Sequence, residues 1–113
     1  MALWLLRGLR RRVVTTRYPA RPDPSAALLP TPPAFDPQRL TPELADRLVR
    51  LCPSPRALRR DGDELLLDVG ACTACGRCIE AAGAAARPSG VFELAATDSE
   101  QLRKRIPIQG ATP

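Results

Sequence analysis

Histidine is absent from the 113 residues of this chain. Its absence excludes zinc sites that use histidine, haem ligation by histidine, Rieske-type ligation and every Ser-His or Cys-His catalytic arrangement. Aromatic residues are also scarce, with one tryptophan, one tyrosine and two phenylalanines. We therefore do not expect catalysis from the isolated polypeptide, and the chemistry rests on four cysteines.

An apolar run long enough to span a membrane is also missing. The apolar start, residues 1–9 (MALWLLRGL), is far too short to cross a bilayer. A secretory signal would place its charges before the apolar stretch, whereas Arg10, Arg11 and Arg12 follow it. We interpret the start as a short amphipathic segment lying on a membrane surface or a partner subunit. Two alternatives stay open: a locally docked helix with solvated arginines and a mitochondrial transit peptide.

Acidic residues are missing from the first 22 positions, which hold six arginines. The net charge of the chain is +5, so the remainder has eleven basic residues against twelve acidic ones, or −1. The basicity therefore describes what the N-terminal end contacts and not the domain as a whole. A basic zinc module that binds nucleic acid would carry its charges on the folded domain, so we expect no nucleic-acid partner.

The rest of the chain predicts short elements. Eight of thirteen prolines fall between Pro19 and Pro42, which favours an extended arm over 19–40 that wraps a surface. A helix is predicted over 41–51, with Thr41 as N-cap, Pro42 in its first turn and Leu44, Leu48 and Leu51 on one face. Further predictions are an extended segment at 13–19, a hairpin turning at Asp61-Gly62, a helix at 79–86, a strand at 91–94 and a helix at 98–105.

Three cysteines in consecutive two-residue steps, Cys72, Cys75 and Cys78, begin an iron–sulfur binding loop but lack its usual fourth member, because position 82 is alanine. In two-cluster ferredoxins, each motif gives its fourth cysteine to the other cluster. By that rule, Cys52 in Cys52-Pro53 is the fourth ligand. All four ligands of one [4Fe-4S] cluster are then present.

The other cluster would need cysteines at positions that hold Pro42, Ala45, Leu48 and Ala82. All four of its ligands are missing. Random loss of cysteines would rarely remove every ligand of one cluster and keep every ligand of the other. We expect the helix at 41–51 to fill the vacated space with Leu44 and Leu48.

Zinc in a site of four cysteines is the main alternative cofactor, and disulfides or free thiols are a further one. We favour the cluster because zinc modules usually pair two separate Cys-x2-Cys units. Gly70 and Gly76 would permit the tight backbone that directs amide groups at the sulfurs. Ile79, Leu67 and Val69 would shield the site or pack as ordinary core.

Two segments carry a family resemblance. Residues 8–19, GLRRRVVTTRYP, resemble the N-terminal G-x-V-T-T-R-Y-P signature of the ferredoxin-like subunit of formate hydrogenlyase and related group 4 membrane-bound [NiFe] hydrogenases. LLLDVGACTACGRCIEAA, followed by FELA, resembles the second cluster motif of that subunit, which is related to the two-cluster subunit of respiratory complex I.

The resemblance implies a non-catalytic electron-relay subunit of an oxidoreductase complex, peripheral on the cytoplasmic face of the cell membrane. Its expected partners are a complex I-like small iron–sulfur subunit and a [NiFe]-type large subunit. The chain would contact the membrane arm indirectly or through its N-terminus. Cys52, Cys72, Cys75 and Cys78 carry over as ligands to the cluster nearer the small subunit. Alternatively, the four-cysteine site only stabilises the fold.

The expected fold is α+β, a small ferredoxin-like domain of a hairpin and short helices with an extended N-terminal arm. We divide the chain into a basic segment and docking arm over 1–40, a domain with one cluster site over 41–106, and a tail over 107–113.

Overall fold

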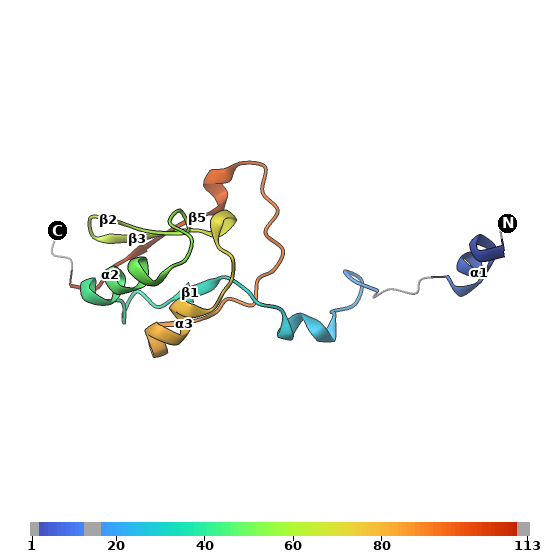
Figure 1. Ribbon diagram of the computed structural model, residues 1–113, viewed down its shortest axis with the longest axis horizontal. Helices are drawn as coiled ribbons and strands as arrows, with labels where there is room; N and C mark the ends of the chain where they lie inside the picture. Colours follow the sequence, from blue (N-terminus) through green and yellow to red (C-terminus); the bar gives the residue numbers. More distant parts are fainter. Residues whose placement is uncertain (1–2, 13–16, 111–113) are drawn as a thin grey trace.

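A computed structural model describes residues 3–12 and 17–110 and has the expected α+β class (Figure 1). One antiparallel sheet has the strand order β2-β3-β5, and a second pairs β1 with β4. The helices are α1 (Leu3–Arg11), α2 (Pro42–Leu51) and α3 (Arg77–Ala82). The strands are β1 (Pro33–Phe35), β2 (Leu58–Asp61), β3 (Glu64–Asp68), β4 (Ala86–Pro88) and β5 (Arg103–Pro107).

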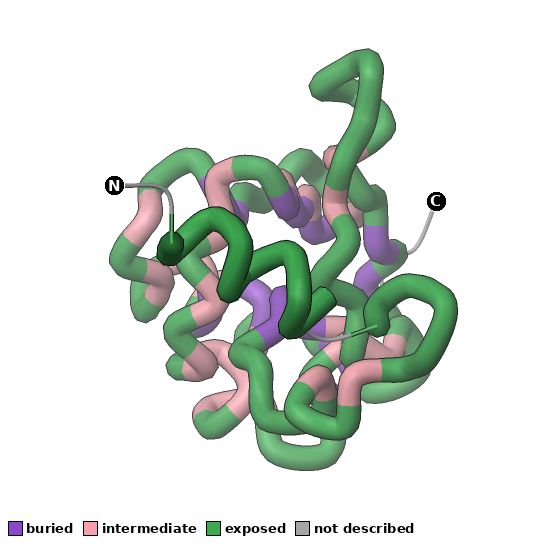
Figure 2. Tube along the Cα trace, turned by 90° about the vertical axis from the view of Figure 1, so that its right-hand side faces the viewer, coloured by how far each residue is buried: buried purple, intermediate pink, exposed green. Residues whose placement is uncertain are grey.

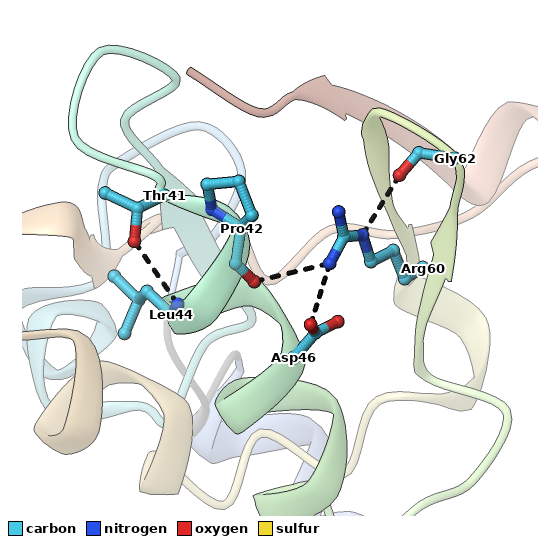
Figure 3. A network of polar contacts seen from close by, with 6 residues as sticks. All are labelled: Thr41, Pro42, Leu44, Asp46, Arg60 and Gly62. Carbon is cyan, nitrogen blue, oxygen red and sulfur yellow. Dashed lines mark hydrogen bonds and ion pairs between the residues drawn. The ribbon is translucent and has the colours of Figure 1, made fainter. Parts of the chain in front are cut away.

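Helix α2 forms where the sequence predicts it. The Thr41 side chain accepts a hydrogen bond from the Leu44 amide at 3.3 Å, and Pro42 opens the first turn (Figure 3). The buried face differs from the expectation, because Leu48 is fully buried but Leu51 is 37% exposed. Leu51 is the last residue of the helix, at the point where the chain turns away toward the hairpin.

The hairpin between β2 and β3 turns one residue later than predicted. Asp61 pairs with Glu64, so the two loop residues are Gly62 and Asp63. Gly62 has φ +58 and so takes the left-handed conformation that a tight hairpin turn requires.

Arg60 ties this hairpin to the start of α2. Its guanidinium donates to an Asp46 carboxylate oxygen at 2.8 Å and to the Gly62 carbonyl at 3.0 Å (Figure 3). A longer contact of 3.5 Å reaches the Pro42 carbonyl. The hydrogen bond to Asp46 raises the pKa of Arg60, although solvent screens a pair this exposed.

The core lies between α2 and the three-stranded sheet. Alternate residues of β3 face it, and both Leu65 and Leu67 are at most 1% exposed. The chain on either side of the 41–106 range joins this core: Leu40 is fully buried, and the Gln109 amide donates to its carbonyl at 2.8 Å. Figure 2 marks all buried residues in purple. The core cluster among them comprises Leu40, Ala45, Leu48, Leu58, Leu65, Leu67, Val69, Ile106 and Ile108.

Three predicted elements differ from the structure. Helix α3 ends at Ala82, because Gly83 has φ +55 and the next residues form a single turn and then β4. Residues 91–94 are not a strand. The predicted helix at 98–105 is a single turn over Ser99–Leu102, capped by Asp98, followed by β5. Pairing with β3 decides the conformation of residues 103–107, and a local pattern cannot show it.

The C-terminal half of the proline-rich arm lies along the domain, because β1 in that half pairs with β4. Near its start, the Tyr18 ring lies 6.0 Å from that of Phe92, and the Tyr18 hydroxyl donates to Glu93. Of the predicted extended segment at 13–19, residues 13–16 lie outside the described residues. Across the described ranges, no helix is long and apolar enough to cross a membrane.

Candidate metal centre

The four cysteines line one pocket at the surface of the domain. Cys52 follows directly after the last residue of α2, where its amide donates to the Leu48 carbonyl at 3.1 Å. Cys72 and Cys75 belong to the loop before α3, and Cys78 lies in the first turn of that helix. The structure thus brings together the four residues that the sequence nominated, from two segments twenty positions apart.

The hairpin and one serine hold these two segments side by side. The Ser54 hydroxyl donates to the Ala71 carbonyl at 3.0 Å and so joins the Cys52 segment to the triple-cysteine loop. The Asp68 amide donates to the Ala57 carbonyl at 2.8 Å, which extends the backbone hydrogen bonding between the two arms of the hairpin beyond β2. Pairing of β2 with β3 therefore determines the distance between the two cysteine segments.

Two residues of the loop take left-handed conformations. Gly76 has φ +78, as its predicted role in a tight loop requires, and Ala74 has φ +52. The Ala74 amide donates to the Cys72 sulfur at 3.4 Å, which is the kind of contact that stabilises a thiolate. Gly70 has another role, since a Cβ there would come within 3.2 Å of the Leu102 side chain.

The thiols affect one another electrostatically. The pKa of Cys78 is raised to about 11, chiefly by burial and in smaller part by the neighbouring Cys72, Cys75 and Cys52. Cys78 therefore holds its proton at neutral pH. Binding of a metal ion, which needs thiolates, would release that proton. Cys75 is the exposed member of the set, whereas the other three are half-buried.

The walls of the pocket are apolar and include a residue that the sequence analysis missed. Pro33, in β1, lines the pocket although it belongs to the arm and lies 19 positions before Cys52. No local motif marks Pro33, since only the pairing of β1 with β4 brings it there. Of the expected shielding residues, Leu67 and Val69 lie in the core, and Ile79 is half-buried. The other lining residues are Pro53, Ala57, Leu58, Thr73, Ala74, Gly76 and Arg77.

The donor set fits a metal group, but the pocket is narrow. Four soft thiol ligands with no competing carboxylate among the lining residues suit iron–sulfur or zinc chemistry. The volume of this surface pocket is about 20 Å³, room for little more than a water molecule. Within residues 3–12 and 17–110, no group of three or more cysteine or acidic side chains is arranged to hold a metal ion.

The positions of the missing second set of cysteines are apolar. Ala45 and Leu48 are fully buried in the core, and Ala82 packs against it. Pro42 is the first residue of α2. Leu48 thus fills space as expected, and Leu44 packs against the core in a partly buried position.

The comparisons with known proteins leave the family open. No protein-family model matches the chain, and no curated protein matches it significantly.

Proposed function

We propose that the chain is an electron-transfer subunit that carries a single [4Fe-4S] cluster in a membrane-bound hydrogenase or complex I-like oxidoreductase. The observation that carries the proposal is the gathering of Cys52 with Cys72, Cys75 and Cys78 around one pocket. Their spacing is that of a cluster loop completed by a cysteine from an upstream Cys-Pro.

The four cysteines would hold the cluster, which when bound accepts and donates single electrons. Four protein thiolates leave no position for a substrate, so the site favours relay over catalysis. The Ala74 amide, which already donates to Cys72, would favour the thiolate form of that residue. Arg77 lines the same pocket, and its positive charge would favour the reduced state.

The family resemblance supports a place in a larger assembly. It implies docking on a complex I-like small iron–sulfur subunit, beside a [NiFe]-type large subunit, on the cytoplasmic face of the cell membrane. The arm and the N-terminal segment would be docking elements, because the exposed residues of the arm include Leu28, which is 85% exposed, and Leu29, which is 47% exposed.

A structural role for the site is the second candidate. The same four thiols are compatible with it, because zinc accepts four cysteine ligands in a tetrahedral arrangement. In that case the metal would hold the loop at 72–78 against α2 and would exchange no electrons.

The test is the content of iron, acid-labile sulfide and zinc per chain in anaerobically purified protein, with EPR spectroscopy of the reduced sample. About four irons and four sulfides with one cubane-type signal would support the relay. Zinc without sulfide would overturn it in favour of the structural site. A midpoint potential far outside the range of the partner centres would also count against a relay.

A further inference from the structure

Helix α1 combines an apolar side with a basic side. At 100° per residue, Leu5, Leu6 and Leu9 project to one side of the helix, and Arg7, Arg10 and Arg11 project to the other. Among the residues that the structure describes, none in α1 is buried. Figure 2 shows this, with the helix next to the N label green along its length.

The apolar side of α1 lacks a covering surface in the described chain. Leu5 is 51% exposed, Leu6 58% and Leu9 69%. A helix of 9 residues is also below the length at which an isolated helix is stable in water. Binding to a surface would remove both costs, because it would bury the apolar side and stabilise the helical conformation.

Charge and composition indicate what that surface is. The first 22 residues hold six arginines and no acidic residue. This end of the chain therefore attracts anions, and no negative side chain in it opposes that attraction. Trp4 suits a bilayer interface, where an aromatic ring is partly in contact with lipid and its N–H with water. A short basic amphipathic helix with leucine and tryptophan is typical of segments that lie in the headgroup region.

We propose that α1 binds the surface of an anionic phospholipid bilayer, with Leu5, Leu6 and Leu9 toward the acyl chains and the arginines among the headgroups. Each arginine near such a surface strengthens binding about fivefold. The inference goes beyond the proposed function and does not depend on the cysteine site.

The single tryptophan of the chain provides a direct measurement, because Trp4 lies in α1 itself. The full-length protein is titrated with vesicles of phosphatidylcholine alone, or of three parts phosphatidylcholine to one part phosphatidylglycerol. We expect a blue shift of the Trp4 emission and protection from an aqueous quencher only with the anionic vesicles. Added salt should weaken the binding, since it screens the arginines.

Three variants separate the contributions to binding. Arg7→Gln, Arg10→Gln and Arg11→Gln combined should weaken binding on the order of a hundredfold. The matched control removes the same charge from exposed arginines of the domain, as Arg56→Gln, Arg59→Gln and Arg87→Gln combined, and should bind like the parent. Leu5→Ser with Leu9→Ser keeps every charge and should lose the blue shift.

An absent blue shift with anionic vesicles, or equal binding to both kinds of vesicle, would overturn the proposal. So would a loss of affinity in the domain control equal to that in the α1 variant, because the charge of α1 would then have no special role. The same titration on the Cys72→Ser variant should give the parent result, so that failure of the cluster proposal and failure of this one are distinguishable.

Discussion

Residues 42–52 and 72–82 are the two segments in which the expected cluster positions follow the same spacing, but they are stabilised in different ways. In the second segment, Cys72, Cys75 and Cys78 surround a surface pocket on an irregular loop. In the first, the equivalent positions are Pro42, Ala45 and Leu48, on a regular helix with two of the three fully buried.

The difference shows two ways to hold a short segment in place. An irregular loop buries little apolar surface of its own, so a bound metal would add to its stability. A helix satisfies its own backbone hydrogen bonds, and each buried leucine contributes about 1.5–3 kcal/mol through removal from water. If the cluster site at 42–48 has been lost, hydrophobic packing now stabilises the segment in place of the metal.

The sharpest test of the comparison removes a ligand from each segment. Cys52→Ala should lose iron and sulfide as completely as Cys75→Ala, because both cysteines line the one pocket although only Cys75 belongs to the loop motif. The measurement is iron and sulfide per chain. The control Ala82→Cys should add no second cluster, because no other thiol lies on α2. Full iron and sulfide in Cys52→Ala would contradict the pairing of the two segments.

Truncation within α2 should destabilise the fold itself. Leu48→Ala should lower the free energy of unfolding by about 2–5 kcal/mol, because Leu48 is fully buried and truncation of its side chain leaves a cavity. Leu51→Ala in the same helix, at a side chain that is 37% exposed, should cost less than about 1 kcal/mol. Urea denaturation of the metal-free protein measures both. Equal losses would mean that α2 does not pack against the sheet as described.

Substitutions at the two left-handed residues of the cysteine loop should change the free energy of unfolding in opposite directions. Gly76→Ala places a side chain at φ +78 and should cost about 1 kcal/mol, although space is open there. Ala74→Gly relieves the left-handed conformation at φ +52 and should stabilise the fold by up to about 1 kcal/mol. The free energy of unfolding again measures both. A change of the same sign in the two variants would contradict the loop conformation.

The smallest effect is expected where Arg60 joins the hairpin to α2. Arg60→Gln should lower the free energy of unfolding only slightly, because its ion pair with Asp46 is partly exposed and screened. The control Arg59→Gln, on the exposed side of the same strand, should change the stability by less than about 0.5 kcal/mol. The loss in Arg60→Gln should shrink at high salt, and an equal loss at all salt concentrations would show that the charge pair is not its cause.

Local patterns were sufficient for the features that depend on near neighbours in the chain. The cap at Thr41, the proline of the first turn and the leucine spacing predicted α2, because capping and helical periodicity act over a few residues. The Asp-Gly pair predicted the hairpin to within one residue. Spacing alone also nominated four cysteines that share a pocket.

Only the tertiary structure decided the features that depend on distant pairing. Residues 103–105 are a strand because β3 lies beside them, and Pro33 lines the cysteine pocket because β1 pairs with β4. Leu40 and Ile108, assigned to an arm and a tail, are buried for the same reason. The sequence thus determined which residues can act, through short-range sterics and the chemistry of the side chains. Packing decided which of them meet, because sheet pairing and burial join positions that no local pattern relates.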